Sequence, residues 1–361
     1  MNRIVLIGNG FDLAHGLKTK YEHFIDWYWE EWGKRLMVGK KYKEEDEFCL
    51  FELRDRIGIS NWYLVRDWYF QDINLNAKEF VQKAKVDTNL CFFKYKSPFF
   101  EQINKSIETK GWVDIENEYY SMLVREKEYG DRVKTLNKQL RFLREKLVEY
   151  LTMESKMRTA VYEEIKEKIY CPINLREIAV DRRNEFTLKK GFPVRNIMLL
   201  NFNYTSTPKR YMEGHSNVTI NYIHGRLDDP QSVIFGYGDE IDANFNILKE
   251  QNNNECLHYV KTIKYVERDN YRKLSEFIES EPFQVVIMGH SCGNSDRTLL
   301  NTLFEHKNCV SIKPYYYVTE EQEDKFNELS INIYRNFINN KQMRDRVVCK
   351  KYTEPLIKQE I

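Results

Sequence analysis

The first ten residues of the chain place the strongest constraint on its fold. Arg3 to Ile7 is a short, β-branched apolar run that ends at Gly8-Asn9-Gly10. A continuous apolar run bounded by a turn signal is typical of a strand buried on both faces, as in parallel sheets. A helix is predicted from Phe11, so the chain opens with a strand, a glycine turn and a helix.

Strand character returns only in the second half of the chain. The predicted strands there are 197–200, 218–223, 233–235, 285–288, 309–312 and 315–318. Helices are predicted between and after them, notably over 296–306 and 320–339. Strands that alternate with helices predict an α/β protein, here with a doubly wound, mainly parallel Rossmann-like sheet.

A long, mainly helical stretch interrupts this pattern after the first strand. Apolar residues at three and four residue spacing predict a helix from Tyr21 to Trp32 and a longer one from Val133 to Tyr150. The seam of the longer helix fits either an intramolecular hairpin or a contact between two copies of the chain. No strand is predicted from 44 to 131. The predicted domains are therefore a core of residues 1–16 and 190–361 and a helical insertion of residues 17–189.

Composition narrows the class of protein and its compartment. The chain is 42% hydrophobic and 31% charged, which is typical of a globular protein with a real core. The net charge of +1 gives no overall attraction to nucleic acid or to an anionic membrane. No apolar run approaches about 20 residues, so we expect a cytoplasmic protein. Seven cysteines without a C-x-x-C pair predict reduced thiols, and no metal site is expected.

Small and polar residues follow several of the predicted strands, where ligands bind in open α/β sheets. The first glycine turn leads into a helix and can present backbone N–H groups to a phosphate or ribose. A second strand-to-helix turn follows the strand 285–288. The residues predicted to contact a nucleotide are Gly8, Asn9, Gly10, Phe11, Asp12, Tyr204, Gly289, His290, Ser291 and Asp296.

Two further strand-end residues suggest chemistry. Asn203 follows the strand 197–200, and its uncharged amide can orient a ribose or a water molecule. His224 ends the strand 218–223, and an imidazole that titrates near neutral pH suits a general base. Together, Asn203 and His224 form a workable catalytic pair for cleaving an N-glycosidic bond.

Other activities stay open at this point. The segment Gly289-His290-Ser291-Cys292-Gly293 matches the G-x-S-x-G pattern of serine hydrolases, although His306, the only later histidine, lies on the helix that follows. A metal-dependent nuclease would need carboxylates that gather magnesium. A non-enzymatic sensor would bind a nucleotide and signal its occupancy to a partner. The carboxylates for the nuclease alternative are Asp114, Glu116, Asp239 and Glu240.

Several blocks of the sequence resemble a known family. Ile4 to Phe24, followed later by NFNYT, IHG, FGYGDE and GHSCGNSDRTLL, resembles the AbiH family of bacterial phage-defence proteins. The resemblance implies a role in abortive infection and suggests a phage-derived trigger. It covers the predicted sheet segments and little of the insertion, which is then a candidate sensor, lid or contact for homo-oligomers.

The same blocks are more remotely similar to the sirtuin-like NAD-binding fold. That likeness implies NAD as substrate or ligand, with the first glycine turn and Phe11 at the pyrophosphate and ribose. It further implies that Asn203 holds the nicotinamide ribose, that His224 is the base, and that Gly289 and Ser291 contact the adenosine half. Thr205 stands where an aspartate often occurs in that fold, and no four-cysteine zinc module is present, so protein deacylation is not expected.

Overall fold

The chain forms two compact units in the computed structural model, which describes residues 1–38, 43–53, 76–86, 91–110, 114–157, 160–186 and 193–358. One unit consists of Met1–Thr19 and Leu151–Ile361, and the other of Lys20–Tyr150. The sequence places residues 151–186 in the predicted insertion, whereas in this division they belong with the first strand. The predicted boundary at residue 189 lies outside the described residues, and independent folding of either domain stays a prediction.

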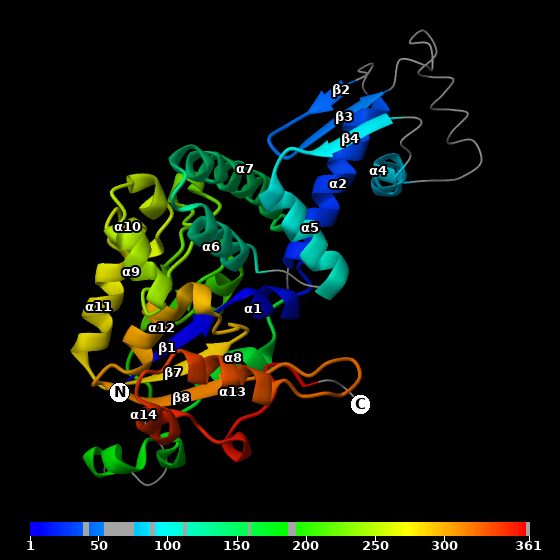
Figure 1. Cartoon of the computed structure of the whole chain (residues 1–361). Helices are drawn as coiled ribbons and strands as arrows, with labels where there is room; N and C mark the ends of the chain where they lie inside the picture. The colour runs from blue at the N-terminus through cyan, green and yellow to red at the C-terminus, as the bar shows by residue number, and fades with distance from the viewer. Residues whose placement is uncertain are drawn as a thin grey trace. The chain divides into compact units, whose positions relative to one another are not determined.

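A five-stranded sheet forms the centre of the first unit (Figure 1). Its order is β6-β5-β1-β7-β8, and all neighbouring strands are parallel. Every residue of the central strand β1 is buried, which explains why its sequence is apolar without alternation. The predicted α/β class and mainly parallel sheet are confirmed. The strands are β1 (Asn2–Ile7), β5 (Ile197–Asn201), β6 (Val218–Tyr222), β7 (Phe283–Met288) and β8 (Cys309–Tyr315).

Helices cover both faces of this sheet. Ile4 and Leu6 of β1 pack in one core with residues of α11, α12 and α13, and Val5 and Ile7 pack in another with α1 and α8. This division follows the alternation of side chains along a strand. The helices of the first unit are α1 (Asn9–Ala14), α8 (Glu163–Tyr170), α9 (Ala243–Glu250), α10 (Lys261–Tyr265), α11 (Asn270–Ser280), α12 (Arg297–Phe304), α13 (Phe326–Arg335) and α14 (Asn340–Arg346).

Three predictions for the first unit were wrong in detail. The predicted strand over 315–318 does not form, because β8 ends at Tyr315 and the residues that follow make only isolated bridges. Residues 233–235 form no strand, although all three are buried; Ile234 instead donates its N–H to the carbonyl of His224 at 2.8 Å. The apolar run therefore reflects burial of an irregular loop rather than a sheet ladder. The predicted helix over 320–339 is shorter and corresponds to α13.

The second unit contains a small sheet that the sequence does not predict. Strands β2 (Lys43–Glu45), β3 (Cys49–Leu53) and β4 (Cys91–Tyr95) pair antiparallel in the order β2-β3-β4. The prediction of no strand in this region was wrong because these strands are only three to five residues long and β2 is entirely charged. The helices of this unit are α2 (Tyr21–Val38), α4 (Ala77–Val86), α5 (Pro98–Lys110), α6 (Ile115–Glu126) and α7 (Gly130–Glu154).

Both helices predicted in the insertion are confirmed, as α2 and α7. The rings of Phe24 and Trp27 lie 5.9 and 5.4 Å from the ring of Tyr150, so the end of the α7 seam packs on α2 of the same chain. This contact is intramolecular, and a contact between copies of the chain stays a prediction. Within the part of the chain that the structure describes, no helix combines the length and apolar character needed to cross a bilayer.

Candidate functional site

The glycine turns after β1 and β7 pack against each other, backbone on backbone. The N–H of Gly10 donates to the carbonyl of Gly289 at 2.8 Å. A Cβ atom on Gly289 would lie 2.1 Å from the nitrogen of Phe11, and its φ of +74° is one that favours glycine. A Cβ on Gly8 would lie 2.5 Å from the Cα of His290. Close contact between the two turns therefore requires glycine at these positions.

Two of the backbone N–H groups that the sequence predicts to bind a phosphate are already hydrogen-bonded within the chain. The N–H of Phe11 donates to the carbonyl of Gly8 at 2.9 Å, and that of Gly10 is engaged by Gly289. The Phe11 ring is fully buried against His15 and Tyr211. Asn9 is exposed. The assignment of this turn to a pyrophosphate and ribose stays a prediction.

A buried polar cluster gathers around Asp296, which precedes α12. Its Oδ1 lies 2.8 Å from Nζ of Lys261 and 3.3 Å from Nε2 of His224, and its Oδ2 lies 3.6 Å from Nε2 of His290. The four residues come from separate segments: His224 follows β6, His290 follows β7, and Lys261 begins α10. The fold thus brings together three residues that the sequence predicts, and it adds Lys261. We call these four residues the Asp296 cluster.

Burial and charge set the protonation of this cluster. Burial, reinforced by the positive charge of Lys261, lowers the pKa of His224, so its imidazole is neutral at pH 7. Burial alone would raise the pKa of Asp296, but Lys261 and His224 hold that pKa well below its ordinary value. The cluster therefore holds an ionised carboxylate beside an unprotonated histidine, as a general base requires.

The His224 ring is oriented through one of its nitrogens. Nε2 lies 3.1 Å from the hydroxyl of Tyr265 and 3.3 Å from Asp296, and within the described residues all of the polar contacts of the ring involve Nε2. The ring of Phe202 packs against the rings of His224 and His290, with centroids 5.2 and 4.2 Å apart. With Nε2 facing the carboxylate, Nδ1 is the nitrogen that can accept a proton.

The loop after β5 carries the other residues predicted there. The side-chain amide of Asn203 donates to the carbonyl of Gly8 at 2.9 Å, and its backbone N–H donates to Oδ1 of Asn201 at 3.1 Å. Asn203 thus ties this loop to the first glycine turn. The hydroxyl of Tyr204 donates to the carbonyl of Ile234 at 3.0 Å, which is a structural contact.

Asp12, a residue of α1, belongs to a separate buried polar contact. It is 1% exposed, and the hydroxyl of Thr205 donates to its Oδ2 at 2.6 Å. Burial raises the pKa of Asp12 to about 6, against the hydrogen bonds from Thr205 and Thr207. Among the described residues, the other carboxylate oxygen, Oδ1, has no hydrogen-bond partner. Its contacts are thus with the loop after β5 and not with the Asp296 cluster.

Sequence reasoning missed Lys261 and Tyr265. The two residues lie four apart on α10, on one face of that helix, and both contact the polar atoms described above. The position of Lys261 could have identified it. It follows the apolar pair Tyr259 and Val260 and lies one helical turn before the buried Tyr265. A lysine on a buried helix face needs a carboxylate partner, which would have pointed to a site.

The alternative activities gain no support from the local geometry. His306 contacts Glu279 at 3.2 Å and is not paired with the exposed Ser291. Asp114 caps α6 by accepting from the N–H of Asn117 at 3.1 Å. Asp239 lies 3.4 Å from Arg297. Across residues 1–358, leaving out the gaps in the description, no group of three or more His, Cys, Asp or Glu side chains could hold a metal ion.

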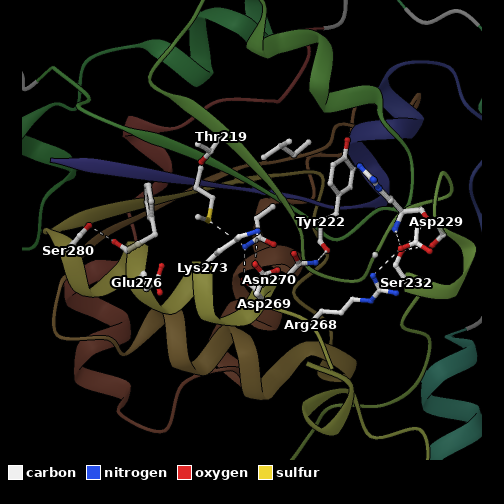
Figure 2. A pocket seen from close by; sticks show the side chains of 16 residues that line it. Thr219, Tyr222, Asp229, Ser232, Arg268, Asp269, Asn270, Lys273, Glu276 and Ser280 are labelled. Atoms are coloured by element: carbon white, nitrogen blue, oxygen red, sulfur yellow. Dashed lines mark hydrogen bonds and ion pairs between the residues drawn. The ribbon is translucent and has the colours of Figure 1, made fainter. Parts of the chain in front are cut away.

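A groove elsewhere on the first unit is lined by other residues. It has a volume of about 680 Å³ and lies between the edge strand β6 and helix α11, with Thr219 and Tyr222 on one side and Asn270 and Lys273 on the other (Figure 2). Its walls contain both acidic and basic side chains, among them the ion pair of Arg268 and Asp229. None of the residues predicted to contact a nucleotide lines it.

A comparison with known protein families found a match. A family model described as bacteriophage abortive infection AbiH matches residues 4–317. The match runs from β1 past the end of β8 and includes every member of the Asp296 cluster. No curated protein matches the chain.

Proposed function

The chain belongs to the AbiH family of bacteriophage abortive infection proteins, and on that premise we propose that it binds a nucleotide such as NAD and hydrolyses its nicotinamide glycosidic bond. Membership of the family implies a role in phage defence. The finer part of the proposal rests on one observation: a neutral, buried His224 is held by the ionised Asp296 at the carboxyl end of the sheet.

The strand order supports a place for the nucleotide. The chain adds β5 and β6 on one side of β1 and then β7 and β8 on the other, as in a doubly wound Rossmann-like sheet. In such sheets ligands bind outside the carboxyl ends of the strands, where the order reverses. In this chain that point lies between β1 and β7, whose glycine turns contact each other. Asn9 of the first turn and Ser291 after Gly289 are exposed, and we assign them to contacts with the phosphates.

His224 acts as the general base in the proposed reaction. The bond between C1′ of the ribose and the nicotinamide nitrogen breaks, and nicotinamide leaves with the bonding electron pair. Water adds to C1′, and Nδ1 of His224 takes the proton that the water loses, which yields ADP-ribose. Asp296, on the opposite ring nitrogen, stabilises the imidazolium that forms. The side-chain amide of Asn203 lies at the first glycine turn, where it donates to the carbonyl of Gly8, and we assign it the role of orienting the ribose.

A non-catalytic sensor is the second candidate, and burial favours it. His224 is 4% exposed, and the amides of Gly10 and Phe11 already have partners within the chain. A protein that only binds NAD would be stabilised by it and leave it intact. Catalysis instead requires a rearrangement that exposes His224, which fits an enzyme that stays inactive until phage infection.

The test uses infected cells that express the protein. Intracellular NAD is measured before lysis in cells that carry the unaltered chain, His224→Ala, or His258→Ala as a control, since His258 is exposed and lies outside the Asp296 cluster. We expect NAD to fall with the unaltered chain and with His258→Ala, and to stay constant with His224→Ala. If cells that carry His224→Ala resist phage as well as cells that carry the unaltered chain, His224 has no catalytic role in defence.

A further inference from the structure

A second, smaller cavity lies beside the loop that follows β5. Its volume is about 330 Å³, near the lower end of the roughly 300–1,000 Å³ typical of small-molecule sites. It lies at the carboxyl end of the sheet, and no member of the Asp296 cluster lines it. The residues around it are Leu17, Ser155, Met157, Thr205, Ser206, Thr207 and Arg210.

Hydroxyl groups dominate the polar part of this cavity, and three of them are oriented by the protein. The hydroxyl of Thr207 donates to that of Thr205 at 3.5 Å. The hydroxyl of Thr205 donates to the buried carboxylate of Asp12 at 2.6 Å, and the hydroxyl of Ser155 donates to the carbonyl of Thr152 at 3.1 Å. A hydroxyl whose hydrogen is engaged in this way has only lone pairs left to offer. These walls therefore accept hydrogen bonds, as a ligand rich in hydroxyl groups requires.

Arg210 is the charged residue among those that line the cavity. A guanidinium group presents a planar set of N–H donors that matches the oxygens of a phosphate or a carboxylate. The cavity thus combines hydrogen-bond acceptors with one cationic side chain. We propose that it binds a small polyhydroxylated anion, with sugar phosphates as the class of ligand that fits it best.

This inference goes beyond the proposed reaction and does not depend on it. Thr205 and Arg210 take no part in the contacts of His224, so a ligand can bind here whether or not NAD is cleaved. The site can be tested by binding alone. Failure here would leave the proposed hydrolysis untouched, and failure of the hydrolysis would leave this site untouched.

The probe is D-ribose 5-phosphate, titrated into the purified full chain by calorimetry beside ribose and inorganic phosphate. Arg210→Gln removes the cation, and Lys209→Gln is the matched control because Lys209 is the exposed neighbour that does not line the cavity. We expect ribose 5-phosphate to bind more tightly than either fragment. Binding should weaken about tenfold or more in Arg210→Gln, and should not change in Lys209→Gln.

A second pair of variants covers a failure of Arg210→Gln to fold. Ser206→Asp places a negative charge at the exposed rim of the cavity, and Ser216→Asp adds the same charge at an exposed position that does not line it. Only Ser206→Asp should weaken binding. Ribose 5-phosphate that binds no more tightly than inorganic phosphate, or equal losses within either pair of variants, would overturn the proposal.

Discussion

Oδ1 of Asp296 lies 2.8 Å from Nζ of Lys261, whose side chain is 1% exposed. Removing two charges from water costs several kcal/mol per ion, and their attraction often no more than offsets it. A buried ion pair is therefore a weak device for stability alone. Beside His224 it has a second effect, because the two charges together set the protonation of that ring. Perturbed, buried groups of this kind are concentrated at functional sites.

Replacing Asp296 with asparagine should strongly destabilise the protein. The change removes the carboxylate that pairs with the buried Lys261, for which the expected loss is roughly 3–5 kcal/mol in the free energy of unfolding. Asp229→Asn breaks the partly exposed pair with Arg268 and should lose less than about 1 kcal/mol. Urea unfolding of the two variants measures both, and equal losses would contradict the buried role of Asp296.

Replacing Lys261 with methionine should raise the pKa of His224. In the unaltered protein burial lowers this pKa, and the charge of Lys261 lowers it further, while Asp296 acts in the opposite direction. Without Lys261, the carboxylate of Asp296 is left to stabilise the imidazolium. An NMR titration of the His224 ring, identified by its absence in His224→Gln, measures the shift. A fall in the pKa would show that Lys261 does not act on this ring.

The lowered pKa of His224 also predicts how stability depends on pH. The unfolded chain binds a proton at this ring more readily than the folded chain, so the contribution is present above pH 6.5 and is lost as pH falls toward the folded-state pKa. His224→Gln should therefore lose less stability than the unaltered protein between pH 7.5 and pH 5. Unfolding midpoints in urea at the two pH values give the comparison. Equal losses would mean that His224 is not buried in its neutral form.

Asp12 should show the opposite dependence. Its folded-state pKa of about 6 lies above the ordinary value of 3.8, so its contribution is full below pH 3.8 and is lost as pH rises through 6. Between pH 5 and pH 7.5 the unaltered protein should lose about 1 kcal/mol more than Asp12→Asn does. Urea unfolding at the two pH values tests this, and the same loss in both proteins would place Asp12 in a solvated environment.

Alanine at Gly289 should be far more damaging than alanine at Gly16. Both glycines have positive φ, at +74° and +80°, so both substitutions carry the backbone penalty of about 1–2 kcal/mol. A Cβ at Gly16 meets nothing within 4 Å, whereas one at Gly289 would lie 2.1 Å from the nitrogen of Phe11. Thermal unfolding should rank Gly289→Ala clearly below Gly16→Ala. Equal midpoints would mean that the two turns are not in close contact.

The sequence predicts the parts of this fold that follow from local pattern. Continuous apolar runs locate β1, β5 and β7, and the spacing of apolar residues locates α2 and α7. The same patterns fail for β2, whose three residues are all charged, and for residues 233–235, which are buried without pairing. An apolar run in the sequence predicts that the segment is buried. A buried segment forms a strand only where a neighbouring strand is available to pair with it.

The sequence predicted most residues of the candidate site but not the contacts between them. His224, His290 and Asp296 each stand at a strand end or a helix start, which a sequence shows. Their meeting at one carboxylate depends on loops from separate parts of the chain, and no local pattern contains that. Lys261 was missed because the residues near it in the sequence do not identify Asp296, the carboxylate that stabilises its buried charge.

The most direct test of the account is the release of nicotinamide from NAD by purified protein. The full chain is incubated with NAD, with and without phage lysate, and free nicotinamide is followed by chromatography beside His224→Ala and His258→Ala. With phage lysate present, we predict that nicotinamide accumulates with the unaltered protein and with His258→Ala, and that it does not with His224→Ala. Intact NAD under both conditions, or release that persists in His224→Ala, would contradict a glycohydrolase with His224 as its base.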